Sequence, residues 1–103
     1  MPTNKLNILF LCTGNSCRSQ MAEGLARSLK GDIIEAYSAG TEPREIDPLA
    51  VKAMAELGID ISGQRSKHVD KFAGMEFDYV ITLCGHAQEV CPFFPGKTRN
   101  IVR

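Results

Sequence analysis

The sequence predicts an α/β fold of three layers, in which helices flank a four-stranded parallel sheet. Short apolar segments of strand length alternate with segments whose apolar residues recur at helical spacing, an order typical of parallel sheets with crossover helices. The first segment is mostly apolar, as in a strand buried on both faces. With 103 residues, the chain is expected to fold as one domain over residues 1–103.

The first half of the chain predicts a strand, a helix and a second strand. Residues 6–11, LNILFL, are mostly apolar and have strand length. Residues 20–30, QMAEGLARSLK, predict an amphipathic helix that ends near Gly31. Residues 33–38, IIEAYS, predict the second strand, which Ala39-Gly40 closes before a polar loop.

The second half begins with a clearly marked helix. Asp47 supplies an N-cap carboxylate, Pro48 suits the first turn, and Gly58 is a natural C-terminal stop. The elements predicted after it are a loop over 60–67, a short helix around Val69 and Phe72, a strand over 77–83, a loop over 84–96 and a strand over 98–102. No helix follows the last strand, so we expect one face of the sheet to be poorly covered.

Composition and charge exclude several classes of function. The chain has 12 basic and 12 acidic residues and no basic run, so neither nucleic acid nor a membrane surface is expected as a partner. Its apolar runs are too short for a spanning helix and its N-terminus lacks the pattern of an export signal, which indicates the cytoplasm. The four cysteines contain no CxxC motif, and we expect no metal and no cofactor.

The segment 12–19, CTGNSCRS, has the residue types of an oxyanion site. It stands between the first strand and the first helix, where active sites of such folds lie. Backbone N–H groups of small residues can converge on one anion there, and Gly14 and Asn15 tolerate the left-handed conformation that this requires. Arg18 adds a planar fork of donors. The predicted oxyanion-binding residues are Thr13, Gly14, Asn15, Ser16, Cys17 and Arg18.

Cys12, at the base of this loop, is predicted to be a nucleophile. A free thiol has a pKa of about 8.5, and a helix N-terminus with nearby cations lowers it. The thiolate would attack the central atom of the bound oxyanion. The alternative is a small apolar cysteine at a strand end, with Arg18 in solvent. The position between strand and helix, together with Gly14, Asn15 and Ser19, argues against that alternative.

The segment CTGNSCRSQMAEG resembles the active-site loop of the low-molecular-weight protein tyrosine phosphatase superfamily, and is especially similar to its branch of thioredoxin-coupled arsenate reductases. The similarity continues through YSAGTEP, DPLAVKAMAELGIDIS and DYVITLCGHAQEVCPFFPG, and covers most of the chain. It implies a phosphatase-like fold and the reduction of arsenate to arsenite in arsenic detoxification. Phosphate and sulfate would be competing anions, and thioredoxin the reductant.

The resemblance also implies a relay of three thiols. Cys12 attacks arsenate, Cys84 attacks the Cys12–arsenic adduct and releases arsenite, and Cys91 then moves the disulfide to Cys84–Cys91. A dithiol can supply the two electrons that arsenate takes up. Cys84 and Cys91 could instead be incidental thiols. Cys17 is interpreted as a packed loop residue that faces the first helix. The predicted catalytic residues are Cys12, Arg18, Ser19, Cys84 and Cys91.

Two polar residues are predicted to support the loop. Ser19 would donate a hydrogen bond to the Cys12 sulfur, as the matching serine does in the family. Asn15 would cross-link the loop, act as a left-handed turn residue, or do both. His68 and His86 are assigned no catalytic role.

A potassium site is not expected. Glu23 and Ser38 match positions that surround a potassium ion in some family members. The acidic residue that completes that site corresponds to Lys67 here. The lysine brings its own positive charge, and we expect it to pair with Glu23.

One departure from the family concerns the general acid. The family places an aspartate in an Asp-Pro loop after the fourth strand, followed by a long helix, and the sequence ends at Arg103, about where that loop would start. Asp47-Pro48 is interpreted as a helix cap. The sequence therefore predicts a shortened chain without a visible acid, with weakened catalysis, reduced stability and a tendency to self-associate through the uncovered sheet face.

Two other functions remain open at this stage. A phosphotyrosine or small-ester phosphatase would use Cys12 and Arg18 but leave Cys84 and Cys91 idle. A non-catalytic oxyanion-binding or redox-sensing module would bind the anion without turnover.

Overall fold

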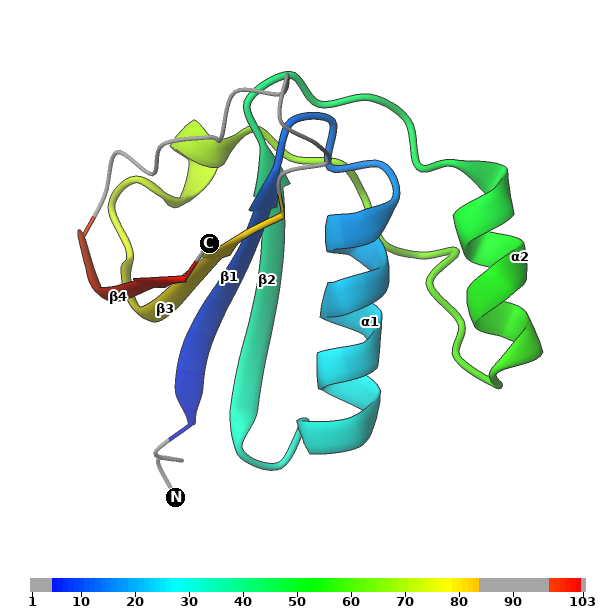
Figure 1. Ribbon diagram of the computed structural model, residues 1–103, viewed down its shortest axis with the longest axis horizontal. Helices are drawn as coiled ribbons and strands as arrows, with labels where there is room; N and C mark the ends of the chain where they lie inside the picture. Colours follow the sequence, from blue (N-terminus) through cyan, green and yellow to red (C-terminus); the bar gives the residue numbers. More distant parts are fainter. Residues whose placement is uncertain (1–4, 84–96, 103) are drawn as a thin grey trace.

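The computed structural model describes residues 5–83 and 97–102, and these residues form the predicted α/β architecture (Figure 1). Every helix and strand predicted within them is present, with ends shifted by at most two residues. The elements in chain order are β1 (Leu6–Cys12), α1 (Arg18–Lys30), β2 (Ile34–Gly40), α2 (Pro48–Glu56), the 3₁₀ helix η1 (Val69–Phe72), β3 (Glu76–Thr82) and β4 (Lys97–Val102).

The sheet is parallel and places β1 in its interior. The strand order is β2-β1-β3-β4, and each neighbouring pair is parallel. The sequence predicts that β2 ends before Ala39-Gly40, but the strand includes both residues. Leu11 pairs with Ala39, and Cys12 pairs with Gly40. The carboxyl end of β1, where Cys12 stands, is therefore flanked by backbone on the β2 side.

Local signals account for both ends of α2. The Asp47 carboxylate accepts a hydrogen bond from the Leu49 N–H at 2.9 Å, as expected of an N-cap. Gly58 has a φ of 78°, and its N–H donates to the Ala55 carbonyl at 2.9 Å. A left-handed glycine after the last turn is the common way to end a helix. The predicted start and stop of this helix are both confirmed.

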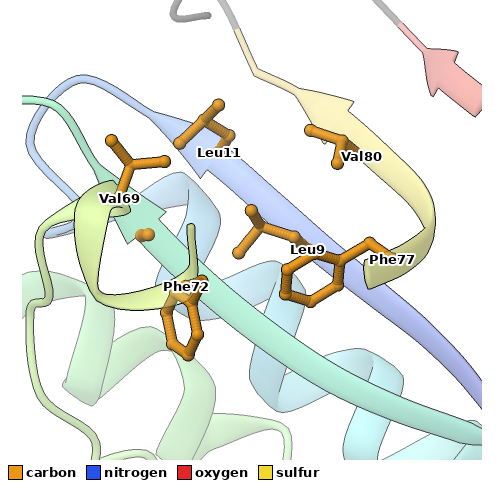
Figure 2. Close-up of a cluster of buried hydrophobic side chains, with 7 residues drawn as sticks. Leu9, Leu11, Val69, Phe72, Phe77 and Val80 are labelled. Atoms are coloured by element: carbon orange, nitrogen blue, oxygen red, sulfur yellow. The ribbon is translucent and has the colours of Figure 1, made fainter. Parts of the chain in front are cut away.

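The core on one face of the sheet is closed by η1. Leu9 and Leu11 of β1 project toward Val69 and Phe72 of η1 (Figure 2). The Phe72 ring meets the Phe77 ring edge to face, with 6.1 Å between the centroids. Each of these five side chains is at most 6% exposed, so the one short 3₁₀ turn seals the centre of this face.

On the opposite face, α1 covers β1 and β2, and α2 lies beyond α1 (Figure 1). Phe10 shares this face with Ser38, its partner on β2. Phe10 and Ile81 are only partly buried, and Tyr79 is 37% exposed. The predicted poor cover of one face is thus seen at Phe10 and over β3, whereas self-association through this face stays a prediction.

No helix of the described part of the chain combines the length and the apolar character that crossing a membrane requires.

The contact between α1 and the segment after α2 yields a stability prediction. Gly24 of α1 lies so close to Ile61 that an added methyl group would be 2.6 Å from Cγ2 of Ile61. Gly24→Ala should lower the free energy of unfolding by about 1–3 kcal/mol through overpacking, although alanine favours a helix. Urea unfolding measures this.

Gly63→Ala is the matched control, because nothing lies within 4 Å of a methyl group at Gly63. It should change the free energy of unfolding by less than about 1 kcal/mol. Equal effects of the two substitutions would contradict the packing argument.

Candidate active site

The loop between β1 and α1 folds around the sulfur of Cys12. The Asn15 N–H donates to Sγ at 3.1 Å, and Oγ of Ser19 lies 2.9 Å from Sγ. Cys12 is 6% exposed and stands in a cavity of about 250 Å³ that is lined by residues 12–14, 16–18 and Arg44. Hydrogen bonds donated to sulfur stabilise negative charge on it. The contact that the sequence predicts between Ser19 and the Cys12 sulfur is present.

Asn15 holds the loop in this shape. It is fully buried, with a φ of 48°. Its amide Nδ2 donates to Oγ of Ser19 at 2.9 Å, and its Oδ1 accepts from the Lys67 N–H at 2.8 Å. Because Ser19 Oγ accepts this bond, its own hydrogen is available for the Cys12 sulfur. Both roles predicted for Asn15 are confirmed.

Gly14 does not share the left-handed conformation expected of it. Among the described residues, positive φ values occur at Asn15 and Gly58. Gly14 instead provides room, since a methyl group there would lie 3.2 Å from Oγ of Ser16.

Gly40 and Gln20 are structural supports that the sequence analysis missed. A methyl group at Gly40 would lie 2.4 Å from the Thr13 carbonyl oxygen, so β2 must carry a glycine where the loop passes over it. Nε2 of the fully buried Gln20 donates to the Asn15 carbonyl at 2.9 Å. The sequence could have suggested this role for Gln20, because it is a polar residue next to Ser19 in the first turn of a helix.

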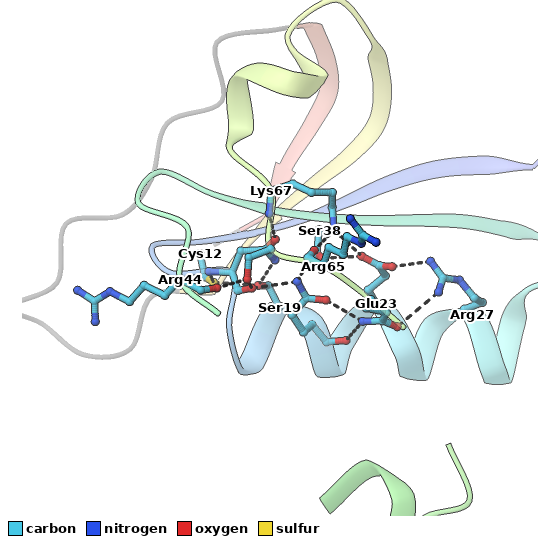
Figure 3. A network of polar contacts seen from close by, with 12 residues as sticks. Cys12, Ser19, Glu23, Arg27, Ser38, Arg44, Arg65 and Lys67 are labelled. Atoms are coloured by element: carbon cyan, nitrogen blue, oxygen red, sulfur yellow. Dashed lines mark hydrogen bonds and ion pairs between the residues drawn. The ribbon is translucent and has the colours of Figure 1, made fainter. Parts of the chain in front are cut away.

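A charged network lies behind the loop (Figure 3). The Glu23 carboxylate is buried and accepts hydrogen bonds from Oγ of Ser38 and from Arg27, each at 2.5 Å. Nζ of Lys67 lies 3.8 Å from Oε1 of Glu23. Burial lowers the pKa of the Lys67 ammonium, and the Glu23 carboxylate acts in the opposite direction. The pairing of Lys67 with Glu23 is confirmed, whereas the part played by Arg27 was not predicted.

The remaining predicted residues fall into three groups. Cys17 precedes α1 and packs against Met21, with 4.0 Å between the two sulfur atoms, as predicted. Arg18 begins α1 and lines the cavity with an exposed side chain. Cys84, His86 and Cys91 lie outside the described residues.

His68 has a structural contact in the described part of the chain. His68 is exposed and caps η1, its Nδ1 accepting from the Asp70 N–H at 3.0 Å. Within residues 5–83 and 97–102, no three His, Cys, Asp or Glu side chains gather as metal ligands would.

The two functions of Asn15 can be separated by substitution. Asn15→Gly keeps the left-handed backbone but removes both amide bonds, and should cost about 1–3 kcal/mol of stability because buried groups lose partners. Asn15→Ala adds backbone strain of about 1 kcal/mol. Urea unfolding should therefore rank the parent above Asn15→Gly and Asn15→Gly above Asn15→Ala. A reversed order of the two variants would refute the conformational argument.

Comparison with known proteins agrees with this geometry. The family model of the low molecular weight phosphotyrosine protein phosphatases matches residues 7–103. The arsenate reductase of Halalkalibacterium halodurans is 53% identical over 98 residues, which are 95% of this chain and 70% of that protein.

Two solved structures extend the comparison. An arsenate reductase in the phosphate binding state has a TM-score of 0.74 and 45% identity, over 80% of this chain and 63% of that chain. A thioredoxin-dependent arsenate reductase of Corynebacterium glutamicum has a TM-score of 0.73 and 35% identity, over 99% of this chain and 50% of that one. With a family match over nearly the whole sequence and a relative at this level of identity, the chain belongs to the low molecular weight phosphotyrosine protein phosphatase family.

Proposed function

We propose that this protein reduces arsenate to arsenite, with Cys12 as the nucleophile. The observation that carries the proposal is the buried Cys12 sulfur, which receives the Asn15 N–H and contacts Ser19 Oγ at the floor of a small cavity beside two arginines. Relatives with about 50% sequence identity to this chain are arsenate reductases. One structurally similar arsenate reductase is in a phosphate-binding state. Phosphate and arsenate are both tetrahedral oxyanions, which one nest of donors can hold.

In the first step, Cys12 Sγ attacks the arsenic atom. The loop N–H groups and the Arg18 guanidinium would hold the arsenate oxygens, as such groups do at helix N-termini. A sulfur–arsenic bond forms, and one oxygen of arsenate leaves as water after protonation. The hydrogen bonds at Sγ keep the sulfur aimed into the cavity.

In the second step, the Cys84 thiolate attacks Cys12 Sγ. A Cys12–Cys84 disulfide forms, the sulfur–arsenic bond breaks, and its electron pair stays on arsenic, which leaves as arsenite. Cys91 then attacks Cys84, which frees Cys12 and forms Cys84–Cys91. The place of Leu83, the last described residue before Cys84 in the sequence, supports the proposal: its N–H donates to the Leu11 carbonyl of β1 at 2.8 Å.

The final disulfide needs an external dithiol. Thioredoxin is the proposed reductant, and the thioredoxin-dependent reductase of Corynebacterium glutamicum supports this choice. One thioredoxin disulfide would form for each arsenite released.

The relay predicts distinct failures for two cysteine variants. Cys91→Ser should release about one arsenite per chain and stop with Cys12–Cys84 formed, because nothing moves the disulfide onward. Cys84→Ser should release none. Quenched arsenite assays and disulfide mapping by mass spectrometry measure both outcomes, with the parent chain supplied with thioredoxin, thioredoxin reductase and NADPH as control. If both variants sustain multiple turnovers, the relay is wrong.

The Glu23–Lys67 pair predicts that potassium does not change the rate of arsenate reduction. Lys67 Nζ already brings positive charge to the Glu23 carboxylate, so a bound cation gains little there. Arsenate reduction should proceed equally fast in potassium and sodium salts at matched ionic strength. Marked activation by potassium would show that a cation site forms in spite of Lys67.

Phosphate-ester hydrolysis is the second candidate, favoured by the match to a phosphatase family over residues 7–103. It would use Cys12 and Arg18 without any redox step, so Cys84 and Cys91 would take no part. Hydrolysis of p-nitrophenyl phosphate that persists in Cys84→Ser, without arsenite production by the parent, would select this alternative.

A further inference from the structure

We propose that Arg44 is a second arginine of the anion site and sets its affinity for doubly charged oxyanions. The proposal rests on the function proposed above and adds a residue from a different part of the chain. Arg44 lies in the loop between β2 and α2, and nothing in the Cys12 motif points to it.

Backbone hydrogen bonds fasten the Arg44 loop to the Cys12 loop. The N–H groups of Glu42, Arg44 and Asp47 donate to the carbonyls of Thr13, Gly14 and Ser16, each at 2.8 Å. On its other side, the Arg44 carbonyl lies against Oγ of Ser66, which shares its one hydrogen between that carbonyl and the Asn15 carbonyl at 2.7 Å. The Arg44 backbone is therefore held in place from two directions.

The stem of Arg44 crosses over Gly14. A methyl group at Gly14 would lie 3.8 Å from Cδ and 3.9 Å from Cγ of Arg44. Figure 3 shows Arg44 beside Cys12, with its side chain extended away from the buried network. Within residues 5–83 and 97–102, its guanidinium makes no hydrogen bond or ion pair, so turning toward an anion breaks no contact with this part of the chain.

The charge at the cavity mouth favours anions. Arg18 and Arg44 both line the 250 Å³ cavity, and among the described residues no carboxylate lines it. Glu42 and Glu45 are neighbours of Arg44 in sequence, but both are exposed and neither lines this cavity. A cation at the mouth of such a site attracts dianions over several ångströms, and salt screens the attraction. We therefore assign Arg44 to binding, and Arg18 to holding the anion during attack.

Arg65→Gln provides a matched control for Arg44→Gln. Arg65 lines a neighbouring hollow of about 660 Å³ together with Arg44, but not the cavity that holds Cys12. Both substitutions remove one positive charge from an exposed side chain. A general effect of net charge would change both variants equally.

The test is the binding of inorganic phosphate to the reduced protein, measured by isothermal titration calorimetry. Arg44→Gln should weaken phosphate binding about 5–10-fold at low salt. The difference in affinity between this variant and the parent should become smaller at high salt. Arg44→Lys should recover most of the affinity, and Arg65→Gln should match the parent. In arsenate reduction, Arg44→Gln should raise KM by a similar factor while kcat stays within about twofold.

Parental phosphate affinity in Arg44→Gln, or equal loss in Arg65→Gln, would overturn the proposal. Phosphate binding needs no redox chemistry, so this result is independent of arsenate turnover. A chain that binds phosphate through Arg44 but produces no arsenite would disprove the proposed function and leave the role of Arg44 standing.

Discussion

The position of the Cys12 sulfur depends on the buried amide of Asn15. Its Nδ2 engages Ser19 at the start of α1, and its Oδ1 engages the Lys67 backbone from a segment 52 residues away. The bond to Ser19 leaves that hydroxyl able to donate to Cys12. The Asn15 side chain thus links the start of α1 to Lys67, and its backbone N–H donates to the Cys12 sulfur at the end of β1.

The rest of the site extends this arrangement. Behind the loop, Glu23 is balanced by Arg27, Lys67 and Ser38, so the buried carboxylate is compensated by the chain itself. In front of the loop, the 42–47 segment runs alongside it through backbone bonds and brings Arg44 to the cavity. A hydrogen-bonded floor beneath the Cys12 sulfur and an exposed arginine at the cavity mouth are the features on which the proposed anion binding depends.

Local signals account for the elements that were predicted correctly. Asp47 and Gly58 mark the ends of α2 through bonds made within a few residues, and alternating apolar segments give the order of strands and helices. The same locality explains the errors. The inclusion of Gly40 in β2 depends on its partner Cys12, and which residue of the loop turns left-handed depends on the contacts that surround Asn15. Neither contact leaves a pattern in the neighbouring sequence.

The sequence alone determined the fold class and the loop contacts of Asn15 and Ser19, and it predicted Cys12 as the nucleophile, because strand–loop–helix spacing and residue chemistry are local properties. The tertiary structure decided which distant residues complete the site. Gly40 supports the loop, Gln20 and Ser66 hold the Asn15 carbonyl, and Arg44 reaches the cavity. The physical reason is the parallel sheet: its crossovers bring separate loops to one edge, and only the packed chain shows which side chains meet there.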